Sequence, residues 1–183
     1  MARLRLLDRT TAPLGGRHHF EGGDPGPVVA ALAQVPELLA PTVDFIGAAF
    51  GPGAASTRHK EMAILRTSWR QGCRYCTQAR TVAALDTGLS VEEVGVLRGA
   101  QPLDSAFSDP AELVLLDWID AMAATGPVTN LVWDNARAFW PEHILVELSI
   151  TIGATLFLNR FATGFELPSS AAVVERLAAE GWA

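Results

Sequence analysis

From Val28 onward, apolar residues recur in this chain at helical spacing, and no stretch alternates apolar and polar residues as a half-buried β-strand would. Glycine and proline divide the pattern into segments at Gly51-Pro52-Gly53, Gly88 and Gly126-Pro127. A length of 183 residues suits one domain, since chains of about 150 residues already bury roughly two thirds of their unfolded surface. The sequence therefore predicts an all-α, single-domain protein over residues 28–183, preceded by an irregular arm over residues 1–27 that buries little.

Capping residues predict where the helices begin and end. Ser56 or Thr57 can cap a helix that ends near Arg70, and Gly72 suits the left-handed residue that closes it. Cys73 would then open the next helix, which ends before Gly88. Further starts are predicted at the capping box Ser90-Val91-Glu92-Glu93, at Asp109-Pro110 and at Thr129. The remaining helices are expected over residues 28–34, 37–50, 141–162 and 169–180.

Charge and hydropathy bear on the partners of the protein. A net charge of −6 and a pI near 5.1 offer no basic surface for nucleic acid or an anionic membrane. The hydrophobic fraction of 49% is high for a soluble domain, and residues 141–162 are apolar nearly all round. We therefore expect a homo-oligomer with that helix at or next to the subunit contact. The charged N-terminus lacks the apolar run of a signal peptide and the stretch Leu148–Leu158 is short for a membrane span, so we expect a cytoplasmic protein.

The tetrapeptide Cys73-Arg74-Tyr75-Cys76 holds both cysteines and the only tyrosine of the chain. Two thiols at this spacing can cycle between dithiol and disulfide, which makes redox chemistry the first hypothesis. The alternatives are half of a metal site or an inert buried pair. A structural zinc needs four ligands, and the histidines at 18, 19, 59 and 143 lack the paired spacing that would complete one, so we expect no metal.

The expected helix start gives the two thiols different surroundings. At the helix N-terminus, free N–H groups and the macrodipole favour a Cys73 thiolate. Cys76 lies one turn further on the same face, more shielded and within bridging distance. Arg80 follows after another turn, where its cation can stabilise a Cys76 thiolate, although a solvated helix arginine is an equal alternative.

Residues 61–99 resemble the core of the alkylhydroperoxidase D and carboxymuconolactone decarboxylase superfamily. The shared features are Glu61 twelve residues before the Cys-Arg-Tyr-Cys motif, an Ala-rich turn, Gly88-Leu89-Ser90 and acidic residues after it. More loosely, residues 141–166, with Leu158-Asn159-Arg160-Phe161, are similar to the closing helix of the family. The resemblance covers about half to two thirds of the chain.

The resemblance implies a role for each site residue. Cys76 matches the thiol that attacks a peroxide, Cys73 the resolving thiol, and Glu61 the carboxylate of a proton relay. Tyr75 is a candidate proton donor, although packing is an equal alternative. The resemblance also implies a trimer or a multiple of it, an external thiol as electron donor, and no cofactor.

Arg80 departs from the family pattern, which usually places a histidine four residues after the second cysteine. Arginine stays protonated, so it can stabilise an anion but cannot relay a proton. We expect a peroxidase-like enzyme that reduces a hydroperoxide. The alternatives are another enzyme on this scaffold acting on an anionic metabolite, as in the decarboxylase branch that generally lacks vicinal thiols, and a non-catalytic redox sensor. His59 is expected at the surface, and His143 in the core or at an interface.

Overall fold

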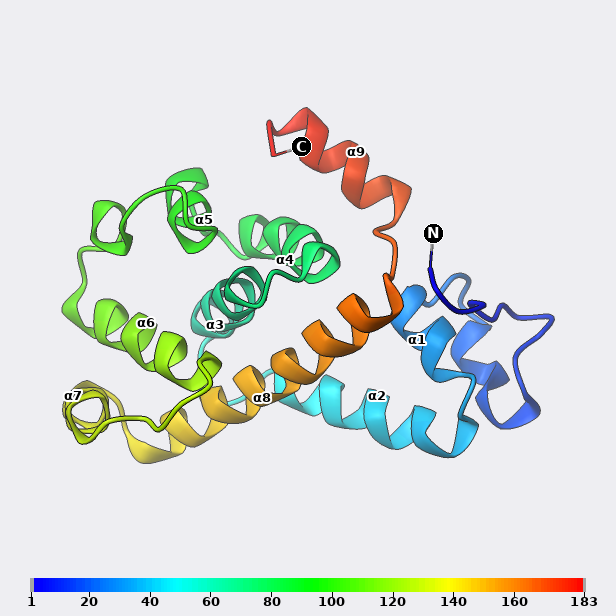
Figure 1. Cartoon of the computed structure of the whole chain (residues 1–183), viewed down its shortest axis with the longest axis horizontal. Coiled ribbons are helices and arrows are strands. Elements are labelled where there is room, and N and C mark those ends of the chain that lie inside the picture. The colour runs from blue at the N-terminus through cyan, green and yellow to red at the C-terminus, as the bar shows by residue number, and fades with distance from the viewer. Residues whose placement is uncertain (1, 183) are drawn as a thin grey trace.

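The computed structural model describes residues 2–182, and every regular element in that range is helical. Figure 1 shows the arrangement, with the N-terminal arm and α1 at one end of the molecule and α6 and α7 at the other. A 3-10 helix lies at Leu14–Phe20 and a second at Leu103–Ser105. The α-helices are α1 (Pro27–Leu32), α2 (Pro36–Phe50), α3 (Thr57–Arg70), α4 (Arg74–Asp86), α5 (Val91–Leu97), α6 (Pro110–Ala123), α7 (Asn130–Phe139), α8 (Glu142–Phe165) and α9 (Ala171–Ala179).

Helix α3 occupies the centre of the fold and packs against α4, α6 and α8. Its apolar side chains form the main core with those of α6 and α8, among them the fully buried Met62, Leu65, Leu115 and Ile152. Helix α2 runs along α8 in the lower part of Figure 1. These packing relations place α1, α2, α3, α4 and α8 around one region, where the thiols lie.

The capping pattern confirms the expected starts of the central helices. The hydroxyl of Ser56 accepts the N–H of His59, and Gly72 closes α3 with a φ of +64°. Because an L side chain strains in that conformation, glycine suits the sharp turn that separates α3 from Cys73. Ser90 and Glu93 form the expected capping box, and Asp109 and Thr129 cap α6 and α7. Helix α8 runs three residues beyond the expected end, to Phe165, and Glu166 follows in the left-handed region.

The N-terminal arm is mostly exposed or half-buried, but a few of its residues anchor it to the rest of the fold. Ala12 and Phe20 are buried and pack with Leu39 of α2. A Cβ on Gly16 would lie 2.8 Å from the side chain of Leu39, so the arm approaches α2 as closely as a backbone can. A single aromatic side chain is enough to anchor a segment whose composition otherwise supplies turns.

An ion pair between a buried lysine and a half-buried glutamate fixes the loop between α2 and α3. Nζ of Lys60 lies 2.6 Å from a carboxylate oxygen of Glu147 and donates to the carbonyl of Gly51 at 2.6 Å. The same carboxylate accepts the backbone N–H groups of Ala54 and Ala55. Burial of Lys60 is tolerated because its charge is paired and its hydrogen bonds are made. The loop therefore holds the end of α2 at a fixed place beside α3 and α8.

Helix α8 is long and apolar enough, by length and composition alone, to cross a membrane, with 24 residues. In this fold one side of it is buried by its neighbours: Leu148, Thr151 and Ile152 are fully buried. Such packing is typical of the central helix of a helical domain.

The opposite side of α8 leaves large apolar side chains exposed, namely Val146, Ile150 and Phe157. Leu38 and Phe45 of the neighbouring α2 are exposed as well. We expect copies of the chain to cover this face, so light scattering at micromolar concentration should give a mass well above the 19.5 kDa of one chain. Ile150→Asp should reduce that mass, whereas Val91→Asp, an equally exposed apolar position on α5, should not. A monomeric wild type would refute the expectation.

Candidate active site

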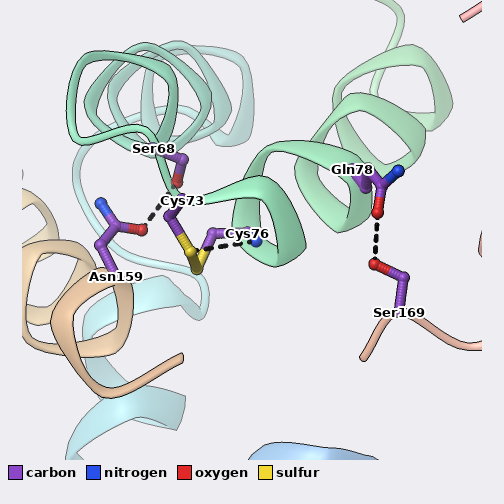
Figure 2. The surroundings of a disulfide bond; sticks show 6 residues. All are labelled: Ser68, Cys73, Cys76, Gln78, Asn159 and Ser169. Carbon is purple, nitrogen blue, oxygen red and sulfur yellow. Dashed lines mark hydrogen bonds between the residues drawn. A yellow bond between two sulfur atoms is a disulfide. The ribbon is translucent and has the colours of Figure 1, made fainter. Parts of the chain in front are cut away.

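Cys73 and Cys76 are joined by a disulfide at the start of α4, with their Cα atoms 5.3 Å apart. Cys73 is the N-cap residue, and its sulfur accepts the backbone N–H of Cys76 at 3.3 Å. The N–H of Cys73 in turn donates to the carbonyl of Ser68 at 3.1 Å, which ties the thiol turn to α3. Figure 2 shows the disulfide at the turn between α3 and α4, with α4 to its right and Asn159 of α8 to its left. The expected position of the cysteines, at a helix N-terminus, is confirmed.

A cavity of about 240 Å³ lies beside the disulfide. Cys76 borders it, whereas Cys73 is not among its lining residues and is only 1% exposed, against 8% for Cys76. Of the two sulfurs, that of Cys76 therefore has the better access to a bound molecule. Most of the wall is apolar and comes from α1, α2, α3 and α8, through Val28, Val29, Leu32, Val43, Ile46, Ile64 and Leu158.

Glu61 and Arg80 form an ion pair at the edge of this cavity. Nη1 of Arg80 donates to Oε1 of Glu61 at 3.1 Å, and the guanidinium lies 4.7 Å from the ring centroid of Phe50. Burial raises the pKa of Glu61 above its ordinary value, and the charge of Arg80 opposes that rise only in part. The Glu61 carboxylate therefore binds a proton more readily than an exposed glutamate does. In its ionised form it offsets the positive charge of Arg80.

The position of Arg80 differs from that of a solvated surface arginine, because its side chain is only 27% exposed and lines the cavity with Cys76. Glu61 lies among the buried residues of α3, beside Arg80. The sequence left Arg80 open between a partner of the Cys76 thiolate and a solvated arginine, and the structure places it in the cavity wall. Glu61, which was expected to point at the thiols, contacts Arg80 and is not itself among the residues that line the cavity. Phe50, which stacks on Arg80, was not foreseen, since nothing in the local sequence links it to a residue thirty positions away.

Tyr75 lies between the cavity and a larger outer cleft of about 810 Å³, and it lines both. The cleft runs along the N-terminal arm and the start of α9, including Asp24, Pro27 and Ser169. Burial raises the pKa of Tyr75, so the phenol stays protonated at neutral pH. A protonated phenol in this wall can donate a proton or a hydrogen bond.

Ser68 and Asn159 are two further cavity residues to which the sequence assigned no role. Ser68 donates its hydroxyl hydrogen bond to Oδ1 of Asn159 at 3.2 Å, and both side chains are buried (Figure 2). Asn159 stood out in one respect, as an amide that follows the apolar run Leu156-Phe157-Leu158 of α8. Ser68 gave no such signal, because a serine near a helix end is common.

Two histidines lie elsewhere. His59 is half-buried at 3.6 Å from the carboxylate of Glu112, with its ring edge-on to Trp140. Burial lowers the pKa of His59. His143, expected in the core or at an interface, is exposed on this single chain. Within residues 2–182, His, Cys, Asp and Glu side chains form no group of three that could hold a metal ion.

Fold and site together define an all-helical protein with a Cys-x-x-Cys pair beside an apolar cavity. Residues 36–124 match the model of the carboxymuconolactone decarboxylase family. This match spans just under half of the chain, and together with the likenesses in fold described below it supports placing the chain in the superfamily of alkylhydroperoxidase D-like and carboxymuconolactone decarboxylase proteins.

Several solved structures share the fold. An uncharacterized peroxidase-related protein with an alkylhydroperoxidase AhpD core, from Ralstonia eutropha JMP134, superposes with a TM-score of 0.81 at 15% identity, over 94% of each chain. A peroxidase-related protein from Silicibacter sp. TM1040 gives 0.79 at 19% identity, covering 93% of this chain and 92% of that one. The debrominase Bmp8, as a Cys-to-Ala variant in complex with 2,3,4-tribromopyrrole, gives 0.76 at 20% identity, covering 97% and 98%. At these identities the likeness concerns the fold. No curated protein matches the chain significantly.

Proposed function

We propose that this protein is a thiol-dependent oxidoreductase that reduces a hydroperoxide through Cys73 and Cys76. The observation that carries the proposal is the location of Cys76 in the wall of an apolar cavity, with Cys73 behind it at bridging distance. The superfamily supports an enzyme on this scaffold, and its peroxidase-related members support the reaction type.

In the proposed reaction, the Cys76 thiolate attacks the terminal oxygen of the hydroperoxide, and the O–O bond breaks. The products are a Cys76 sulfenic acid and an alkoxide, which takes a proton to become the alcohol. The Cys73 thiol then displaces hydroxide from the sulfenic sulfur, with a proton, so that water leaves and the disulfide forms. An external dithiol reduces this disulfide and is itself oxidised. Overall, one hydroperoxide and two thiols give an alcohol, water and a disulfide.

Proton transfers in this scheme fall to Glu61 and Tyr75. Because burial raises its pKa, the Glu61 carboxylate is a stronger base than an exposed glutamate and can accept the proton that a thiol releases. The protonated phenol of Tyr75 borders the same cavity and can supply a proton to the alkoxide. Arg80 holds Glu61 in place and lies in the same cavity wall as Cys76.

A second candidate is the reductive dehalogenation of a small halogenated aromatic. The debrominase of similar fold was solved with a tribromopyrrole, and the apolar cavity beside Cys76 suits such a ring. Two thiols would supply the two electrons that replace carbon–bromine by carbon–hydrogen, releasing bromide and a proton with the disulfide. An anionic metabolite is less well supported, because Glu61 already offsets the charge of Arg80.

The two candidates are separated by one set of assays with a dithiol reductant. Consumption of cumene hydroperoxide or hydrogen peroxide supports the first, and bromide release from tribromopyrrole supports the second. Sustained turnover also excludes a sensor, because a sensor is oxidised once and stops. If neither substrate is turned over, both candidates fail.

We expect Cys73 and Cys76 to form a reversible intramolecular disulfide, since their spacing and the helix start favour it. Thiol titration under native conditions should find both thiols after reduction, neither after one equivalent of peroxide, and both again after a dithiol is added. If both thiols stay titratable after the oxidant, the redox proposal is wrong.

A further inference from the structure

Asn159 carries a buried hydrogen-bond donor that the fold does not use. The residue lies on α8, is 1% exposed and borders the cavity. Its Oδ1 accepts the hydroxyl of Ser68, as Figure 2 shows, while its Nδ2 has no hydrogen-bond partner among residues 2–182. Buried polar atoms in native proteins are nearly always paired. Among the buried side-chain atoms of residues 2–182 that lack a partner, this one belongs to a residue that lines the cavity, so a molecule in the cavity can supply the missing bond.

Apart from Tyr75, whose phenol lies between this cavity and the outer cleft, the other polar side chains in the cavity wall are already engaged. The hydroxyl of Thr155 donates to the carbonyl of Thr151, one turn back in the same helix, at 2.8 Å. Arg80 is paired with Glu61. A molecule in this mostly apolar cavity would therefore find the carboxamide of Asn159 as a polar contact that costs the protein no bond of its own.

Ser68 connects this carboxamide to the reacting sulfurs. Its hydroxyl fixes the amide of Asn159, and its carbonyl accepts the N–H of Cys73 at 3.1 Å. One buried residue of α3 thus holds both the polar point of the cavity and the turn that carries the thiols. A substrate bound to Asn159 would be held in a defined orientation relative to Cys76.

We propose that Ser68 and Asn159 form a polar anchor, in which Nδ2 of Asn159 donates a hydrogen bond to one polar atom of a neutral substrate whose apolar part fills the cavity. The anchor is a positioning device and takes no part in electron transfer. It rests on the proposed function in one respect, that the anchored molecule is the one Cys76 reduces.

Binding to the oxidised, full-length protein tests the anchor without any turnover. The probes are 2-phenyl-2-propanol and tert-butylbenzene, which differ by a hydroxyl in place of a methyl group. Their affinities are measured by amide NMR shifts, and the ratio of the two affinities is compared between variants. Asn159→Leu should shift this ratio against the alcohol by about tenfold, the usual effect of losing one buried hydrogen bond. Ser68→Ala should shift it in the same direction by less.

Thr155→Val is the matched control, because it removes a hydroxyl from the same wall that bonds only its own helix. The affinity ratio of the two probes for Thr155→Val should equal that for the wild type. Melting temperatures check that each variant is folded. An unchanged ratio in Asn159→Leu, or no binding of either probe, would overturn the anchor. If Asn159→Leu does not fold, Ser68→Ala decides, and an unchanged ratio there has the same meaning.

Failure of the anchor and failure of the proposed function give different results. A shifted ratio with no peroxide consumption would keep the anchor and reject the peroxidase. Peroxide consumption with an unshifted affinity ratio would reject the anchor and keep the peroxidase. If both the anchor and the peroxidase proposal hold, Asn159→Leu should also lower kcat/KM for cumene hydroperoxide. The pH dependence of that rate should stay that of the wild type, because the variant leaves the reactivity of the thiols unchanged.

Discussion

Cys76→Ser should reduce peroxide consumption by about a thousandfold or to background, because the substitution removes the sulfur that borders the cavity and takes the oxygen. Peroxide loss in the presence of a dithiol measures this directly. The fold should persist, since the substitution changes one atom and the thiol turn keeps its backbone bonds to Ser68.

Cys73→Ser is the matched control. It leaves the attacking sulfur in place but removes the thiol that closes the disulfide, so oxidation should stop at a Cys76 sulfenic acid. Mass spectrometry after treatment with dimedone should find one adduct, on Cys76. An adduct on the remaining cysteine of Cys76→Ser, with none on Cys76 in Cys73→Ser, would mean that the two thiols have been assigned in the wrong order.

Arg80→Ala should destabilise the protein by about 2 kcal/mol near pH 8. This is less than the loss expected when one partner of a fully buried ion pair is removed, because Arg80 is partly exposed. The substitution leaves the buried Glu61 without its partner, so the pKa of Glu61 rises further. A glutamate whose folded pKa lies above its unfolded pKa binds more protons in the folded state. Its burial therefore costs nothing at low pH, and the protein loses stability as the pH rises through the window between the two values.

Urea unfolding at pH 5 and pH 8 measures this effect. The difference in unfolding free energy between wild type and Arg80→Ala should be larger at pH 8 than at pH 5. In a Glu61→Gln background the same substitution should show little pH dependence, because no carboxylate remains to titrate. Equal destabilisation at both pH values in the Glu61 protein would mean that the ion pair does not hold this carboxylate ionised.

Activity gives a second result from the same position. If Arg80 stabilises the Cys76 thiolate, Arg80→Ala should raise the apparent pKa of that thiol and slow peroxide attack near neutral pH. Arg80→His should keep or increase turnover, since imidazole can accept and return a proton. If the wild type has almost no peroxidase activity and Arg80→His gains a large one, the result would instead favour a non-peroxidase reaction for the wild-type protein. Identical rates and pH profiles in the wild type and both variants would show that Arg80 acts neither on the Cys76 thiol nor on a bound substrate.

The helices and the thiol turn could be predicted from the sequence because they depend on neighbours within one or two turns. Ser56, Ser90 and Thr129 cap helices through bonds to N–H groups three residues away, and glycine at 72 permits the left-handed turn by itself. The same locality put Cys73 at a helix start with Cys76 one turn on. Apolar periodicity likewise gave the all-α class and the long helix near the C-terminus.

The contents of the site depended on how the helices pack, which no local pattern specifies. Arg80 meets Glu61 and Phe50, and Ser68 meets Asn159 across 91 positions of sequence, because α2, α3, α4 and α8 cross around one cavity. Phe20 anchors an arm whose composition suggested little burial, for the same reason. Backbone hydrogen bonds and caps are short-range and belong to single segments, so the sequence by itself determined them. The placement of side chains from different helices follows from the joint packing of all of them, and only the tertiary structure decided it.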